Sequence, residues 1–198
     1  MSASGDNNRS VRFTKVRIRT AFFELIKEKN IQKITVAEIV RRADISRATF
    51  YLHYFDIYDL LKQTEDDIIF QVIEEIKKFD ESTYVVGEFP IAKRVFEVFN
   101  SHSEELELIF GENGDASFRD KIQTAISDYF KELLSLIVPD NKSLDNVLCF
   151  LVGGILNMFL SNLRSENPSD INTLAMISNR YLRATNVLIG IPEVENDK

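Results

Sequence analysis

The sequence predicts an all-α protein that combines a small N-terminal head with a larger helical body, with about nine helices in total. Two observations support this prediction. The 198 residues include only seven Gly and four Pro, about 6% of the chain against roughly 12% in average usage, so few turns interrupt it. Apolar residues make up 44% of the chain and recur at helical spacing between the breaks.

Composition narrows the class of protein. Cys149 is the one cysteine, so no internal disulfide forms, and a reducing cytoplasm fits best. The N-terminus has no apolar signal core, and the most apolar run, residues 147–160, is shorter than the roughly 20 residues that cross a bilayer. With two His and one Cys, we expect no metal site, and nothing in the sequence calls for another cofactor.

Charge is divided unevenly along the chain. The net charge is -7, with 24 Lys and Arg against 31 Asp and Glu. Residues 1–62 hold 12 basic and 7 acidic residues, a balance of +5, which leaves 12 basic and 24 acidic residues, a balance of -12, for the rest. A basic head on an acidic body suits a protein that meets phosphate at one end only. The alternative is that the uneven charge arises by chance among side chains that merely face water.

The head begins with two predicted helices. Residues 10–29 place Ile18, Phe22, Leu25 and Ile26 at helical spacing without Gly or Pro, which indicates an amphipathic helix after a flexible segment 1–9. A second helix starts at Thr35, because Thr35 and Glu38 form the pattern of a capping box. This helix is expected to end at Arg42 or Ala43.

A turn and a third helix follow. Asp44 tolerates left-handed backbone geometry, and Ser46 is a good N-cap. Two short helices joined by a turn of about three or four residues are typical of a helix-turn-helix, whose second helix reads DNA. The segment 46–55 is rich in side chains that donate hydrogen bonds to phosphates or base edges.

We predict DNA contacts along this segment and at the start of the second helix. Arg47 and Thr49 are expected to point to bases, and Tyr51 and His53 to the DNA backbone. Arg12, Lys15, Arg41 and Arg42 add attraction as a group, although a solvated basic face explains each one alone equally well. The alternative for the segment is an ordinary surface helix. The full predicted set is Thr35, Ser46, Arg47, Ala48, Thr49, Tyr51, His53 and Tyr54.

A long fourth helix capped by Asp56 is predicted to bridge the head, residues 10–62, to the body, residues 63–198. After a break at 82–90, the run 91–114 predicts two helical pieces, and residues 117–138 predict another that ends at Pro139. Residues 143–164 and 170–189 supply the last two helices.

The stretch TVAEIVRRADISRATFYLHYFDIYDLL resembles the DNA-binding signature of the tetracycline-repressor (TetR/AcrR) family of bacterial regulators. The resemblance covers residues 12–62. Two positions depart from the family pattern. Asp44 stands where Gly is usual, and Ile57 stands where many members have a Lys at the start of the fourth helix, so one expected phosphate contact is missing.

The run VLCFLVGGILNMFLSNL is uncharged, and it predicts a helix buried on all sides. A core helix is one interpretation, and a self-association surface is favoured over it. The resemblance likewise implies a homodimer through a four-helix contact. A dimer would set two recognition helices about 34 to 36 Å apart, as a pseudo-palindromic duplex requires. The predicted dimer residues are Val152, Gly153, Leu156, Phe159, Leu160, Ile177 and Tyr181.

Aromatic residues in the body predict either core packing or an effector pocket. The resemblance implies a small hydrophobic or amphipathic effector that favours a state unable to bind DNA. The candidate pocket residues are Phe70, Phe96, Phe99, His102, Phe110, Phe150 and Asn157.

Taken together, these observations predict a cytoplasmic, homodimeric transcriptional regulator, a repressor that binds a double-stranded operator and performs no chemistry. The main rival is a helical module whose head binds another protein, without preference for a DNA sequence. An α-helical enzyme is a weaker rival, because no paired carboxylates, nucleophile with base, or phosphate loop occurs at a meaningful spacing.

Overall fold

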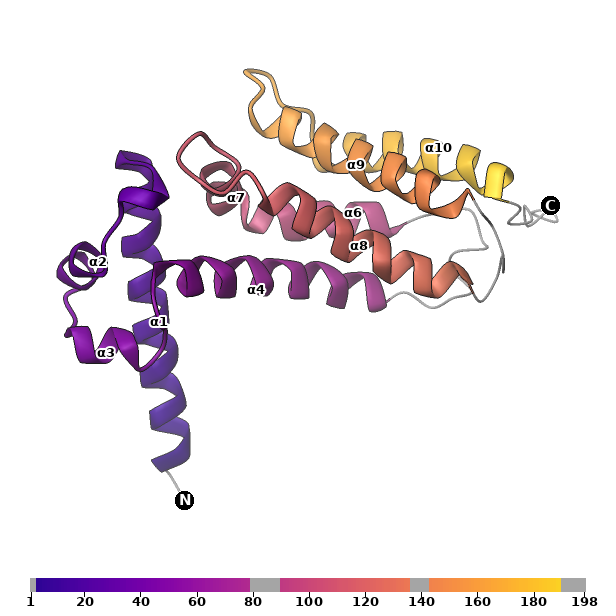
Figure 1. Cartoon of the computed structure of the whole chain (residues 1–198). Helices are drawn as coiled ribbons and strands as arrows, with labels where there is room; N and C mark the ends of the chain where they lie inside the picture. Colours follow the sequence, from indigo (N-terminus) through magenta and orange to yellow (C-terminus); the bar gives the residue numbers. More distant parts are fainter. Residues whose placement is uncertain (1–2, 79–89, 136–142, 190–198) are drawn as a thin grey trace. The chain divides into compact units, whose positions relative to one another are not determined.

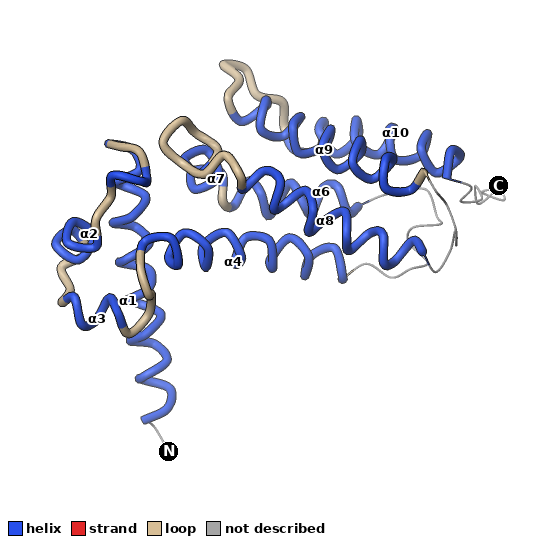
Figure 2. Tube along the Cα trace, viewed as in Figure 1, coloured by secondary structure: helices blue, strands red, loops and turns tan. Residues whose placement is uncertain are grey.

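The computed structural model describes residues 3–78, 90–135 and 143–189. Within these ranges the secondary structure is helical throughout, without a strand (Figure 2). The all-α prediction is confirmed. Of the predicted break at 82–90, residues 82–89 lie outside the described residues, as does the predicted stop at Pro139, whereas Pro90 is already the first residue of a helix.

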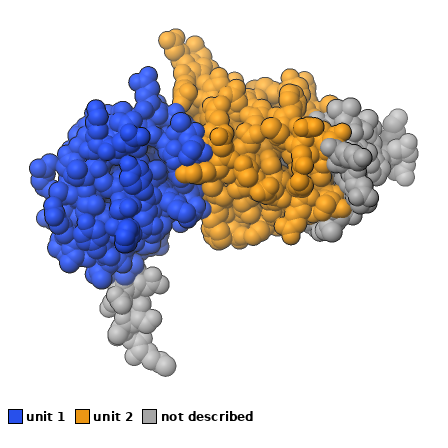
Figure 3. Space-filling view, in the orientation of Figure 1, with its two compact units in different colours: residues 1–67, 104–118 blue, residues 68–103, 119–198 orange. Residues whose placement is uncertain are grey.

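The chain divides into two compact units (Figure 3). Unit 1 contains residues 1–67 together with Glu104–Phe118, and unit 2 contains Ile68–Ser103 and Arg119–Lys198. Unit 1 thus takes in a segment that lies far along the sequence from its other residues. The border predicted after residue 62 lies near Asp67, where the first stretch of unit 1 ends. The second segment of unit 1 was not predicted.

Unit 1 is built around helix α1, Ala3–Glu28 (Figure 1). α1 starts at Ala3 rather than near Ser10, where it was predicted to begin. Ile18, Phe22 and Ile26 are buried, as expected from their spacing on one helical face. A 3-10 turn, η1 (Ile31–Lys33), follows and buries Ile31.

The next elements of unit 1 are α2, Val36–Arg42, and α3, Arg47–Tyr51. α2 packs against both α1 and α3. α4, Ile57–Lys77, starts in unit 1 and continues into unit 2. It buries Leu60, Thr64, Ile68, Val72 and Ile76, which recur every four residues and therefore form one stripe.

The distant segment of unit 1 contains most of α7, Ser103–Ile109, and the loop that follows it. Arg19 on α1 forms two 3.0 Å contacts with Glu105, through its Nε and one terminal nitrogen. In the loop, Asn113 accepts a hydrogen bond from the backbone N–H of Ile31 and donates its side-chain amide to the carbonyl of Ile26. These bonds tie the loop to the end of α1.

Gly114 makes the turn of this loop possible. A Cβ at position 114 would lie 2.1 Å from the carbonyl oxygen of Ile109, far inside any allowed contact. Only glycine fits where the backbone approaches itself so closely.

Unit 2 contains α6 (Pro90–Ser101), α8 (Phe118–Ser135) except its first residue, α9 (Leu144–Leu163) and α10 (Ile171–Ile189). α10 packs against α6 and α9, and Figure 1 draws α9 and α10 side by side. Phe159 of α9 stacks on Phe96 of α6, with ring centroids 5.8 Å apart, and lies tilted against Phe99 of the same helix, with ring centroids 5.2 Å apart. This aromatic cluster forms part of the core of unit 2.

α9 is largely apolar after its first turn but is buried on one side only. Cys149, Phe150, Gly154 and Asn157 are exposed, so the prediction that this helix is buried on all sides is wrong within the single chain. α9 spans 20 residues, and by length and composition alone it would suffice to cross a membrane, with 39% of its most apolar window buried. The prediction that the apolar run, residues 147–160, is too short to cross a bilayer is therefore wrong on length, although a core helix of a soluble protein passes the same test.

Candidate nucleic-acid interface

The start of α2 is fixed by a complete capping box. The backbone N–H of Glu38 donates to the Thr35 hydroxyl, and the N–H of Thr35 donates to the Glu38 carboxylate at 3.0 Å. Lys29, just after α1, donates to the same carboxylate at 2.5 Å. The bond from Lys29, with help from Thr35, lowers the pKa of Glu38 from 4.5 to about 2. The predicted capping box is confirmed. Its bonds to Glu38 engage the Thr35 hydroxyl, which was also predicted to contact DNA.

The turn between α2 and α3 depends on Asp44, the described non-glycine residue with a positive φ, at 50°. One Arg17 terminal nitrogen donates to the Asp44 carbonyl at 2.9 Å and to its carboxylate at 3.1 Å. Asp44 can therefore stand where the signature described above usually has Gly, because a short polar side chain tolerates left-handed backbone geometry. The ion pair adds a local restraint on the same backbone.

α3 presents one face outward and buries the other. The Ser46 hydroxyl accepts the N–H of Thr49 at 3.0 Å and so caps the helix. Phe50 is fully buried, which anchors α3 in unit 1. Arg47, Ala48 and Tyr51 are exposed, and Thr49 and His53 are half-buried. Five of the predicted DNA contacts therefore lie at least partly on the surface beside the predicted N-cap Ser46.

Tyr54 occupies a different environment from its neighbours. It is buried beside Phe50, with ring centroids 5.7 Å apart, and the loss of water around it raises the pKa of its phenol to about 12. We predicted a DNA contact at Tyr54, but its ring belongs to the core of unit 1. Its physical role here is to hold the recognition segment in place.

The basic residues near this face differ in their surroundings. Arg12 and Arg41 are exposed. Arg42 pairs with Glu28 at 2.8 Å and Glu24 at 3.8 Å, so its charge is balanced by α1. Lys15 donates to Gln63 at 3.4 Å and lies 5.6 Å from the centre of the Tyr54 ring. Arg12 and Arg41 thus offer the more open charges of these four.

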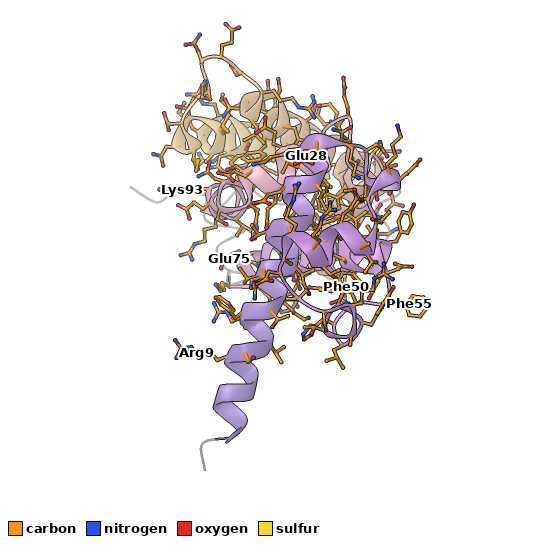
Figure 4. The ribbon with its side chains drawn as sticks, turned by 90° about the vertical axis from the view of Figure 1, so that its left-hand side faces the viewer. Arg9, Glu28, Phe50, Phe55, Glu75 and Lys93 are labelled. Carbon is orange, nitrogen blue, oxygen red and sulfur yellow. The ribbon has the colours of Figure 1, made fainter. Side chains whose placement is uncertain are left out.

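The sequence reasoning missed a group of exposed apolar residues directly after α3. Leu52 and Phe55 are 80% and 83% exposed, and Tyr58 is 58% exposed. Figure 4 shows Phe55 pointing away from the ribbon, in contrast to the buried Phe50. The local sequence does not mark these residues, because their exposure follows from the end of α3 at Tyr51.

The predicted dimer residues are divided between core and surface. Val152, Leu156, Phe159 and Leu160 are buried within the chain, which leaves them little area for a second copy. Gly153 and Ile177 are half-buried, and Tyr181 is exposed. A Cβ on Gly153 would meet the side chain of Gln123 at 3.1 Å, so this glycine allows close packing inside unit 2.

The predicted effector residues do not gather at one point. Phe96 and Phe99 are buried together, and His102 lies 3.1 Å from Gln71 through its Nε2. Phe110 belongs to unit 1, where it stacks on Phe118. Phe70 and Phe150 are exposed, and Asn157 lies 3.5 Å from Arg119. Phe96 and Phe99 are therefore the members that share one apolar environment.

Comparison with known proteins gives a family match over the head. The profile described as "Bacterial regulatory proteins, tetR family" matches residues 18–64. An uncharacterised HTH-type transcriptional regulator of Bacillus subtilis, YxbF, is 29% identical over 92 residues, which cover 46% of this chain and 19% of the relative. A second such regulator of that organism, YvdT, is 24% identical over 133 residues and 66% of each chain. The chain thus matches about a fifth of the first relative and about two thirds of the second.

Solved structures share the fold over nearly the whole chain. A TetR transcriptional regulator from Streptococcus agalactiae has a TM-score of 0.64 and 19% identity, and it covers 90% of this chain and 98% of its own. A protein assigned to the TetR family from Syntrophomonas wolfei also has a TM-score of 0.64, at 15% identity, with 93% and 98% coverage. At these identities the likeness concerns the fold. The profile match over α1 to α4 shows that residues 18–64 form the DNA-binding domain found in bacterial regulatory proteins of the TetR family.

Proposed function

We propose that this protein is a cytoplasmic transcriptional repressor that binds a pseudo-palindromic DNA operator as a homodimer. The observation that carries the proposal is the exposed face of α3, with Arg47, Ala48 and Tyr51 at the surface of a unit anchored by Phe50. A short, well-anchored helix that presents donors to solvent is what direct reading of the major groove requires. The balance of +5 over residues 1–62 favours approach to phosphate.

The second copy would cover the exposed side of α9 and α10. Phe150 is 72% exposed on α9, and Tyr181 is 60% exposed on α10. Gly154 has nothing within 4 Å of the position its Cβ would take, so a partner helix has room to approach closely there. Exposed apolar area on helices that pack together favours association with an identical surface.

Release by a small hydrophobic or amphipathic effector completes the proposal. The cluster of Phe96, Phe99 and Phe159 offers the apolar surroundings that such a ligand needs. The effector must bind the DNA-free state more tightly than the DNA-bound state in order to release the operator. No chemical step forms part of this function.

Selection of duplexes from a random pool with the purified protein, followed by titration of the selected duplex at fixed salt, tests the proposal. We expect Thr49→Ala and Tyr51→Ala each to weaken binding by about 1 to 3 kcal/mol, because Thr49→Ala removes a contact to a base and Tyr51→Ala removes a contact to the DNA backbone. Thr124→Ala, at an exposed position of α8, is the matched control and should bind as the wild type does.

Two outcomes would count against the proposal. Unchanged affinity in both variants would reject α3 as the reading element. Weak binding of the wild-type protein, equal for selected and random duplexes, would favour a head that binds a protein partner instead.

A further inference from the structure

The residues after α3 form an apolar surface that the proposed function has not used. We call Leu52, Phe55 and Tyr58 the apolar tip. All three side chains are more than half exposed, and Leu52 and Phe55 are at 80% and 83%. Large apolar side chains that cluster at the surface next to a binding element commonly mark part of a contact surface. Leu52 is itself the C-cap of α3, so the apolar tip continues directly from the recognition helix.

The start of α4 beside the tip is unsuited to a phosphate. The Asp56 carboxylate accepts the N–H of Asp59 at 2.8 Å, and the Asp59 carboxylate accepts the N–H of Phe55 at 2.8 Å. Gln63 also donates to Asp59 at 3.1 Å. These carboxylates accept hydrogen bonds from backbone N–H groups that could otherwise bind an anion, and their negative charge repels a phosphate.

The chemistry of the tip limits what it can recognise on DNA. Leu52 and Phe55 carry no donor or acceptor in their side chains. In the major groove, the C5-methyl group of thymine is the apolar feature of the base edges. A DNA contact through these two residues is therefore one to thymine methyl groups, since nearby carboxylates disfavour the phosphate backbone.

We propose that Leu52 and Phe55 contact thymine C5-methyl groups in the operator, next to the bases read by α3. This inference rests on the proposed function, because it needs a specific duplex. It makes Leu52 and Phe55 specificity-determining residues, and it assigns the operator a thymine at the positions that lie against the tip. Tyr58 borders the contact from the first turn of α4.

The test compares thymine with deoxyuridine, which differs from it by the methyl group alone. Each thymine of the selected duplex is replaced in turn, and the affinity is measured by titration with the full-length protein. Wild-type protein should lose about fourfold in affinity for each contacted methyl group, the value expected for one buried methyl. Leu52→Ala or Phe55→Ala should bind the thymine and deoxyuridine duplexes equally at that position.

Two measurements separate this contact from other effects. Thr124→Ala, at the exposed position of α8 in unit 2, should keep the full sensitivity to the methyl group. The slope of log affinity against log salt should be unchanged in Leu52→Ala, because an apolar contact releases no counterions, whereas Arg41→Ala, which removes an exposed charge, should reduce it.

The outcomes distinguish this inference from the function on which it rests. Specific wild-type binding with no deoxyuridine effect at any position, or equal sensitivity in wild type and both variants, would overturn the thymine contact and leave the operator proposal standing. A change in oligomeric state in Leu52→Ala or Phe55→Ala, without a change in DNA affinity, would assign the tip to a protein partner and also overturn it. Failure of the wild type to select any duplex would reject the proposed function first.

Discussion

Asp44 holds the turn between α2 and α3 in a conformation that costs free energy for any residue with a Cβ. Its φ of 50° is left-handed, and the two bonds from Arg17 stabilise it there. The Asp44 side chain is 96% exposed, so the ion pair itself contributes little because water screens it. The strain of the backbone therefore outweighs the benefit of the ion pair.

Asp44→Gly should accordingly stabilise the folded protein. We expect the free energy of unfolding to rise by about 0.5 to 1 kcal/mol, because glycine adopts positive φ without steric cost. Urea titration followed by circular dichroism measures the change. Arg17→Ala is the companion variant and should lower stability only slightly. If Asp44→Gly proved less stable than Arg17→Ala, the ion pair would be the dominant interaction in this turn.

Local chemistry allowed several side chains to be predicted from the sequence, whereas others depend on where a helix stops. Thr35 and Ser46 were predicted as caps because a cap is recognised within four residues. Tyr54 and Phe55 are adjacent aromatic residues, yet one is buried and the other is 83% exposed. Nothing within that short pattern distinguishes them, because their burial follows from the end of α3 and the direction of α4.

The junction of α1 with α2 is stabilised by a single carboxylate. The Glu38 carboxylate accepts a hydrogen bond from Lys29, which follows the end of α1, and completes the capping box of α2. Its pKa is lowered to about 2 from 4.5. A carboxyl group whose pKa is depressed on folding stabilises the protein at pH values above 4.5 and loses this contribution as the pH falls toward 2.

Glu38→Gln should therefore be less stable than the wild type at pH 7, and the difference should shrink steadily between pH 5 and pH 2. Thermal unfolding across this range measures it. Glu166→Gln, at an exposed site in the loop after α9, controls for the removal of one negative charge. A difference between Glu38→Gln and wild type that stayed constant with pH would show that shape, rather than ionisation, matters at this junction.

Helices with clear caps were predicted more closely than helices without them. The predicted starts of α2 and α3 agree with the structure because Thr35 and Ser46 mark them. The start of α1 was placed too late, since its first residues are polar and carry no apolar period. α9 was expected to be buried on all sides because its composition is uniformly apolar. Composition cannot distinguish a side packed within the chain from a side left for a second copy.

The proposed dimer makes a prediction for the whole molecule. Phe150→Glu should give a monomer, because it places a charge at the centre of a surface expected to lose its water on association. Sedimentation velocity measures the mass. Phe70→Glu, at a similarly exposed phenylalanine of α4, is the matched control and should remain a dimer. Persistent dimers in Phe150→Glu would assign self-association to another surface.

The division of the chain into units was only partly predictable. The change in charge after residue 62 lies close to the end of the first stretch of unit 1 at Asp67. The addition of Glu104–Phe118 to that unit had no counterpart in the sequence. Its bonds to Ile26 and Ile31 are made largely through backbone atoms, which every residue carries and which leave no characteristic pattern.

This second segment bears on how the protein is made. During synthesis the first 67 residues are made before Glu104 is added, so α1 lacks Glu105 and Asn113 while the intervening chain is being translated. Contacts between residues so far apart in sequence form late and slow the completion of a fold. The newly made head thus reaches its final stability only after Phe118 has emerged, which delays a fully formed DNA-reading surface until more than half of the polypeptide exists.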